Sequence, residues 1–253
     1  MTVHFIGAGP GAADLLTVRA TRLIAAAQVV LYAGTYLDEE VLSYCAPGAT
    51  RIDTQHLNLD QITAHLVDAH ARGQEVARLC SGDPSIYSAV AEQGRRLDAA
   101  GVPWDVTPGV PAYAAAAAVL GRELTVPEVA QTVILTRAHA RSTARPESIG
   151  QLAKSRATMV LHLAVTQTRS LAAELTAEYG ADCPVAVLAN VSQPSQLVLR
   201  GTLADIGDQV EAAGLRQAAV IIVGHALAAR AFPDSHLYTP DRVRASEGSS
   251  NDD

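Results

Sequence analysis

The chain has 253 residues, of which 49% are hydrophobic, so it is long enough to bury one large core or two smaller ones. Its formal net charge of −7 argues against a nucleic-acid partner, which needs a basic face. The longest apolar stretch, residues 112–120, is far too short to span a bilayer, so we expect no membrane partner.

The three cysteines, Cys45, Cys80 and Cys183, lie far apart and form no C-x-x-C pair. An odd number without close spacing does not suit a disulfide framework. The N-terminus lacks the basic stretch and apolar segment of a signal peptide. We therefore expect a protein of the reducing cytoplasm.

The first half of the chain alternates apolar, strand-like runs with helical patterns. Strands are predicted at residues 3–6, 28–32, 50–52, 75–79 and 104–107. Helices are predicted at residues 17–27, 59–72, 84–100 and 112–121. In the third helix, Asp83 is placed to cap the first turn and Pro84 suits the first helical position.

The second half continues the alternation. Strands are predicted at residues 132–136, 158–163, 185–189, 197–200 and 219–223, and helices at 147–154, 167–179 and 203–213. Such alternation indicates an α/β fold, but ten strands are unusual for one open sheet. We expect two α/β lobes, residues 1–120 and 121–244, each with a mostly parallel or mixed sheet, and a ligand cleft between them. The polar tail, residues 245–253, is expected to be disordered.

The most informative turn is GAGPG at residues 7–11, which follows the first predicted strand. Its glycines let the backbone turn tightly and approach a ligand closely. Gly7, Gly9 and Ala12 fit the G-x-G-x-x-A spacing of dinucleotide sites, so a nicotinamide- or flavin-dependent oxidoreductase is one alternative. Against it, Pro10 removes an N–H that could hold a pyrophosphate. The next strand also ends without an acid for a ribose hydroxyl.

Two further turns, SGDP at residues 81–84 and PGVPA at 108–112, also follow a strand and precede a helix. Taken alone, each is typical of an ordinary capped helix. Ligands of α/β sheets bind beyond the carboxyl ends of strands, where all three turns belong. Three such turns in one lobe predict a single shared ligand cleft.

The order and wording of these turns resemble the tetrapyrrole methyltransferase family, which uses S-adenosylmethionine (SAM) to build sirohaem and cobalamin. Four motifs match: GAGPG (7–11) together with LLT (15–17), SGDP (81–84), PGVPA (108–112) and ATMVLHL (157–163). The resemblance covers about residues 3–225, and four ordered motifs are more specific than any one. The segments YAGTY (32–36), DT (53–54), LNLDQI (57–62) and QTVILTR (131–137) resemble the branch that methylates the corrin precursor precorrin-4 at C-11.

The resemblance implies two α/β lobes, a homodimer, and SAM held between the lobes and released as S-adenosylhomocysteine. It further implies that SAM contacts Pro10, Ser81, Gly82, Asp83, Ile86, Pro111, Ala112, Leu163, Ala189, Asn190 and Val191. Many of these residues are small, which fits a site built from main-chain groups and apolar walls.

One position departs from the sirohaem-forming members of the family. They carry an aspartate directly after the tyrosine of the second strand, where this chain has Ala33. The base proposed for them is therefore missing, which argues against uroporphyrinogen III as substrate. Tyr32 is our candidate catalytic residue, as a polar contact facing the cleft. The alternative is a strand-end tyrosine that packs under a loop.

A tetrapyrrole polycarboxylate needs cations at its site. Arg137, Arg141 and Arg145 follow a strand of the second lobe and are predicted to bind its carboxylates, because arginine pairs carboxylates in bidentate fashion. The alternative is a solvated loop. His162 and His225, next to apolar strands, are expected to be core residues with satisfied hydrogen bonds.

No Cys/His cluster or H-E-x-x-H motif occurs, so no metal centre is predicted. Two alternatives remain open beside the oxidoreductase. One is a cobalt-containing form of precorrin-4 as substrate, and the other is a SAM-binding module without catalysis.

Overall fold

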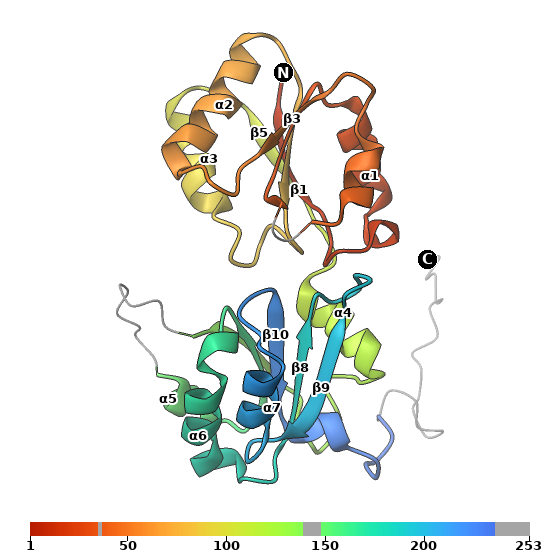
Figure 1. The fold of residues 1–253 in the computed structure, drawn as a ribbon, viewed down its shortest axis with the longest axis vertical. Helices are drawn as coiled ribbons and strands as arrows, with labels where there is room; N and C mark the ends of the chain where they lie inside the picture. Colours follow the sequence, from red (N-terminus) through yellow and green to blue (C-terminus); the bar gives the residue numbers. More distant parts are fainter. Residues whose placement is uncertain (35–36, 139–147, 236–253) are drawn as a thin grey trace, which may run out of the picture.

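The computed structural model describes residues 1–34, 37–138 and 148–235. These residues form two lobes, one above the other in Figure 1, and each lobe contains a five-stranded sheet with helices on both faces. This confirms the predicted α/β fold class. None of the helices in the described ranges is long and apolar enough to cross a membrane.

The N-terminal sheet is entirely parallel, with strand order β3-β2-β4-β1-β5. Its strands are β1 (Val3–Gly7), β2 (Val29–Tyr32), β3 (Thr50–Asp53), β4 (Val76–Cys80) and β5 (Trp104–Thr107). β1 lies between β4 and β5, so the carboxyl ends of these three strands adjoin at one edge. The three predicted turns leave from that edge.

Helices cover both faces of this sheet. α1 (Val18–Ala26) and a 3₁₀ helix (Glu39–Tyr44) lie on one face, and α2 (Leu59–Ala71) and α3 (Val90–Ala99) on the other. Successive strand side chains alternate between the two faces, so Ile6 packs toward α1 while Phe5 packs toward α2 and α3. Burial on both faces explains why the inner strands β1, β2 and β4 are mostly apolar, whereas the edge strands β3 and β5 carry more polar, exposed residues.

The predicted start of α3 is wrong. The helix begins at Val90, not at Pro84, because Tyr87 and Ala89 adopt left-handed backbone conformations (φ 53° and 56°) that interrupt a helix. Asp83 does not cap it. Its carboxylate instead accepts hydrogen bonds from Ser85 and from a separate turn, as described below.

The C-terminal sheet is mixed, with order β6-β7-β10-β8-β9. Its strands are β6 (Val133–Arg137), β7 (Thr158–His162), β8 (Pro184–Ala189), β9 (Leu197–Thr202) and β10 (Ala219–Val223). Only β6 and β7 pair in parallel, and β10 runs antiparallel to both β7 and β8. This sheet is thus more antiparallel than expected. Residues 190–196, between β8 and β9, are too few for a parallel crossover.

Helices α5 (Ile149–Ala153), α6 (Thr168–Tyr179) and α7 (Ile206–Ala212) cover one face of this sheet. α4 (Ala112–Leu120) covers the other face, where Ala116 and Leu120 pack with Val160 and Ile222. α4 therefore belongs to the core of the C-terminal lobe. We propose a lobe boundary just before α4 rather than after it. The tail at residues 245–253 lies outside the described residues.

Candidate functional site

The three glycine-containing turns are tied to one another by hydrogen bonds, two of the turns through backbone groups and the third through a carboxylate. Gly9 and Gly82 form a two-way bridge, with N···O distances of 3.2 Å and 2.7 Å. Ala8 N donates to Cys80 O at 2.8 Å. The third turn joins through its Gly109 N, which donates to the Asp83 carboxylate at 2.8 Å. One rigid edge is built from segments about 100 residues apart in the sequence.

The close approach of these turns explains two of the glycines. A Cβ on Gly7 would lie 2.4 Å from Gly109 N, and a Cβ on Gly109 would lie 2.3 Å from Gly82 O. Both separations are far below contact distance, so any side chain there would force the turns apart. The glycines first serve turn-to-turn packing, whatever ligand the edge holds.

Asp83 is the charged group that holds this edge together. Its carboxylate accepts hydrogen bonds from the Ser85 backbone N at 2.8 Å, from the Ser85 hydroxyl and from Gly109 N. Burial alone would raise the pKa of Asp83, but these hydrogen bonds outweigh it and leave the pKa below its usual value. Asp83 is therefore ionised at neutral pH.

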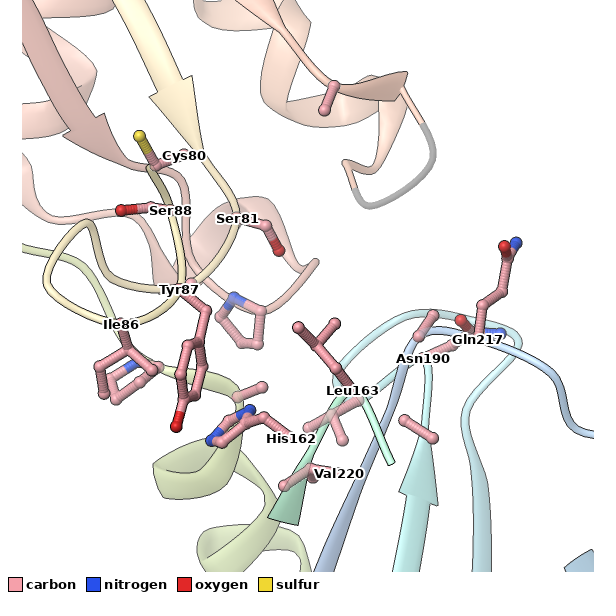
Figure 2. A pocket seen from close by; sticks show the side chains of 18 of the residues that line it. Cys80, Ser81, Ile86, Tyr87, Ser88, His162, Leu163, Asn190, Gln217 and Val220 are labelled. Atoms are coloured by element: carbon pink, nitrogen blue, oxygen red, sulfur yellow. The ribbon is translucent and has the colours of Figure 1, made fainter. Parts of the chain in front are cut away.

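A cavity of about 560 Å³ lies between this edge and the C-terminal lobe. Figure 2 shows Ser81, Ile86 and Tyr87 on one side and Leu163, Asn190 and Gln217 on the other. The lobes also meet beside it, where Ala12 N donates to the Ser192 hydroxyl at 3.0 Å. Its volume is in the range of small-molecule sites.

Ten of the eleven residues predicted to contact SAM line this cavity. They are Pro10, Ser81, Gly82, Asp83, Ile86, Pro111, Ala112, Leu163, Asn190 and Val191. The eleventh, Ala189, is the last residue of β8, and it is buried and does not line the cavity. The structure therefore brings ten of the residues that the resemblance implies, from both lobes, to one cavity.

Tyr32 is not brought to the cavity. It ends β2 and packs partly buried against the cluster on the α1 side of the sheet, while its carbonyl accepts a hydrogen bond from Thr54 N at 2.7 Å. This is the arrangement that sequence analysis gave as the alternative. Its neighbour Ala33 does line the cavity and presents only a methyl group there.

Arg137 ends β6 and lies near the cavity without lining it. Its Cζ atom is 5.8 Å from the centroid of the Tyr87 ring, a cation–π distance, and Tyr87 itself lines the cavity. The other two predicted carboxylate-binding residues, Arg141 and Arg145, lie outside the described residues.

Sequence reasoning missed the segment that leads into β10. Arg216, Gln217 and Ala218 line the cavity, because β10 is antiparallel and its start lies beside the ends of β7 and β8. They precede β10 instead of following a strand, so they are not at the carboxyl end of any strand. The absence of a predicted helix between β8 and β9 was the available sign that this sheet is not parallel.

Four cavity residues other than glycine have left-handed backbones: Tyr87, Leu163, Asn190 and Ala218, with φ between 47° and 54°. Such conformations cost about 1–2 kcal/mol each for residues with a Cβ. Leu163 is also 59% exposed, which is unusual for a leucine at the end of a core strand. Strain of this kind gathers at ligand sites.

The expectation that His162 and His225 are satisfied core residues is wrong. His225 is exposed, in a 3₁₀ helix after β10. His162 lines the cavity, and its Nε2 atom is buried without a hydrogen-bond partner in the described part of the chain. Burial lowers the pKa of His162, so its imidazole is neutral at neutral pH.

Two further ionisable groups line the cavity. The Arg78 side chain is buried and donates to the Gln93 side-chain oxygen at 3.2 Å and to Leu79 O at 3.1 Å. Burial raises the pKa of Cys80 to about 11, so this residue stays a thiol and is no nucleophile at neutral pH. Within the described ranges, no group of three His, Cys, Asp or Glu side chains could hold a metal ion.

Comparison with known proteins gives a consistent result. The family described as "Tetrapyrrole (Corrin/Porphyrin) Methylases" matches residues 2–207. A precorrin-4 C(11)-methyltransferase from Rhodococcus erythropolis is 59% identical over 246 residues, which is 96% of this chain and 99% of that protein.

Two solved structures are also similar. A cobalt precorrin-4 methyltransferase of cobalamin biosynthesis superposes with a TM-score of 0.86 at 36% identity, covering 89% of this chain and 95% of the other. Uroporphyrin-III C-methyltransferase from Thermus thermophilus, in complex with S-adenosylhomocysteine, has a TM-score of 0.76 at 28% identity, covering 90% and 99%. The oxidoreductase alternative finds no support in these matches. The chain belongs to the tetrapyrrole methylase family.

Proposed function

We propose that this protein transfers a methyl group from SAM to C-11 of precorrin-4, giving precorrin-5 and S-adenosylhomocysteine. The observation that carries the proposal is the cavity between the lobes, which is lined by ten of the eleven residues that the family resemblance implies for SAM. The 59% identical relative is a precorrin-4 C(11)-methyltransferase, which supports the choice of precorrin-4 and of C-11.

The chain's own residues suit a methyl donor of this kind. When bound, SAM supplies a methyl group on a positively charged sulfur. The edge built from Pro10, Gly82 and Asp83 offers backbone groups and a carboxylate, while Ile86 and Leu163 offer apolar surface. A mostly apolar pocket with a few placed polar groups is what such a ligand needs.

The main task of the site is alignment. Methyl transfer is an in-line displacement, and holding two reactants in attack geometry supplies roughly 7–11 kcal/mol of the barrier. The two lobes hold the reactants in this geometry because they enclose the cavity from two sides. Arg137, and with it Arg141 and Arg145, would bind the carboxylates of the tetrapyrrole.

Ala33 argues against uroporphyrinogen III as the substrate. This position faces the cavity and carries no group that could take a proton. The carbon that is methylated must therefore be nucleophilic without a base at position 33. The enamine-like carbons of a reduced tetrapyrrole meet this requirement.

A second candidate substrate is the cobalt complex of precorrin-4. It is favoured by the fold match to a cobalt precorrin-4 methyltransferase at a TM-score of 0.86. The chain is 59% identical to the precorrin-4 C(11)-methyltransferase and 36% identical to the cobalt precorrin-4 enzyme. Metal-free precorrin-4 is therefore our first choice of substrate.

The test is turnover of purified protein with isotopically labelled SAM and either metal-free or cobalt-containing precorrin-4. Mass spectrometry and NMR of the product should show one added methyl group at C-11. Methylation at another carbon would overturn the substrate assignment. Tight calorimetric binding of NAD and none of S-adenosylhomocysteine would overturn the reaction class.

We also propose a homodimer in the cytoplasm. The family resemblance supports the dimer, and three buried, unpaired cysteines suit a reducing compartment. Light scattering during gel filtration tests the first point. Fractionation of cells that produce the protein tests the second.

A further inference from the structure

His162 is a polar side chain in the cavity whose hydrogen bonds are unused. It is the last residue of β7, directly before Leu163. In the described part of the chain neither ring nitrogen has a hydrogen-bond partner, and Nε2 is closed off from solvent as well. A neutral imidazole carries one donor and one acceptor, and leaving them unused in a half-buried site costs free energy. A ligand that uses the open nitrogen, Nδ1, would recover part of that cost.

Aromatic rings surround this imidazole. The Tyr87 ring, from the segment before α3, has its centroid 5.5 Å from that of His162, and Figure 2 shows the two side by side at the cavity. The Tyr113 ring of α4 stands edge-on at 6.4 Å and 86°. Among the described residues, no acidic side chain forms an ion pair with His162.

The residue paired with His162 on the neighbouring strand is a cation. Arg137 is the register partner of His162 on the neighbouring strand β6, and its Cζ lies 5.8 Å from the centroid of the Tyr87 ring. On the other side of β7, the cavity is lined by the apolar Val220 of β10. Burial lowers the pKa of His162, and no acid pairs with it among the described residues, so the imidazole stays neutral and keeps a lone pair for a proton.

Methylation of a reduced tetrapyrrole releases a proton. The nitrogen of the attacked ring bears hydrogen, and its lone pair is conjugated with the attacked carbon through the double bonds of the ring. As the new C–CH₃ bond forms from the enamine electron pair, the S–CH₃ bond breaks and its electrons stay on sulfur. The ring nitrogen then becomes a cationic iminium N–H, which must lose its proton to give the neutral product.

We propose that His162 is the catalytic base of this reaction, accepting the proton of the substrate ring nitrogen at Nδ1. The assignment rests on the proposed function. It supplies the acceptor that position 33 lacks, from the opposite lobe. The rings of Tyr87 and Tyr113, at 54° and 86° to the imidazole, pack around it and hold it in place. Burial disfavours a lasting charge on this imidazole and so favours release of the proton to solvent.

The test compares His162→Gln and His162→Phe with the wild type in single turnovers of precorrin-4 under anaerobic conditions. A catalytic base contributes roughly 10²–10⁴-fold, so both variants should lose at least about 100-fold in rate. Their affinity for S-adenosylhomocysteine should be unchanged. His225→Gln, which changes an exposed histidine of the same lobe, is the matched control and should keep the wild-type rate.

A second variant separates chemistry from packing. His162→Ala leaves room for a small base, so added imidazole should restore part of its rate. Loss of less than about threefold in both His162→Gln and His162→Phe would overturn the assignment. An inactive wild type would instead show that the proposed function is wrong, and the assignment would fall with it.

A measurement without turnover guards against variants that fail to fold. In wild-type protein saturated with S-adenosylhomocysteine, the ¹⁵N resonances of His162 can be followed as precorrin-4 is added. We expect a change at Nδ1, because that atom gains a hydrogen bond. Unchanged His162 resonances at saturating precorrin-4 would contradict the proposal, whatever the variants do.

Discussion

The two walls of the cavity are built in different ways. The N-terminal wall is made of backbone turns that are joined by hydrogen bonds and packed glycine against glycine. The C-terminal wall is made of side chains at strand ends, several of them on strained left-handed backbones. The first wall is a rigid cradle of packed turns, in which an added side-chain atom at Gly7 or Gly109 would clash with a neighbouring turn. The second presents chemically specific groups, and single side chains there can change binding without harming the fold.

The largest effect is expected at the contact between turns. Gly109→Ala would place a Cβ 2.3 Å from Gly82 O, so the turns must separate. We expect a loss of about 3 kcal/mol in the free energy of unfolding, as for severe overpacking. Affinity for S-adenosylhomocysteine should fall on the order of 100-fold, or about 2.7 kcal/mol. Urea denaturation and calorimetry measure the two quantities.

Gly101→Ala is the matched control for this variant. Gly101 has a positive φ, 67°, which Gly109 does not, but nothing lies within 4 Å of its Cβ position. The free energy of unfolding of Gly101→Ala should fall by about 1–2 kcal/mol from backbone strain alone, and its affinity for S-adenosylhomocysteine should be unchanged. Equal loss of affinity in both variants would show that the cradle is not especially sensitive.

Asp83→Asn should come next. The variant weakens the charge-assisted hydrogen bonds to Ser85 and Gly109, and we expect a loss of about 1–2 kcal/mol in the free energy of unfolding at pH 7. The pKa of Asp83 is lower in the folded state than in the unfolded chain, so its contribution is complete at neutral pH. It disappears as the pH falls below the ordinary carboxyl value of about 4 and through the folded-state pKa.

Unfolding in urea at a series of pH values measures this dependence. The difference between wild type and Asp83→Asn should shrink on acidification. Asp14→Asn, at an exposed position of the same lobe, should show no such difference. A wild-type advantage that persists undiminished at pH 2 would contradict the explanation.

A smaller effect, of opposite sign, is expected in the C-terminal wall. Leu163→Gly relieves a left-handed backbone (φ 50°) and removes a side chain that is already 59% exposed. We expect stability to rise by about 1 kcal/mol. Affinity for S-adenosylhomocysteine should fall about three- to tenfold, because apolar contact is lost. Thermal unfolding and calorimetry together measure this trade.

Arg156→Gly provides the reference for that trade. Arg156 has a similar φ of 52°, is exposed and does not line the cavity. It should gain stability without losing ligand affinity. A lower free energy of unfolding in Leu163→Gly would instead show that the left-handed backbone at position 163 does not destabilise the fold.

The smallest effect is expected at Tyr32. Its side chain packs on the α1 side of the sheet, so Tyr32→Phe should leave the turnover number of precorrin-4 unchanged. Steady-state kinetics measure it. A loss of more than about tenfold would restore Tyr32 as a candidate catalytic residue.

Much of the molecule follows from local patterns in the chain. All ten strands lie where apolar runs between turn residues predict them, with ends shifted by only a few residues. The three turns of the cradle were recognisable because close backbone approach requires glycine and proline, which leave a visible signature. The set of residues expected to contact SAM came from the family resemblance, not from the patterns alone.

Long-range pairing decided the rest. Whether β10 runs parallel or antiparallel depends on its neighbours across the sheet, and that direction brings Gln217 to the cavity. Asp83 could have capped a helix, yet its carboxylate bonds Gly109 of a distant turn. His162 resembled any core histidine until its neighbours were seen to leave it without partners. A sequence records which groups a chain carries, whereas hydrogen-bond satisfaction depends on residues that only folding brings near.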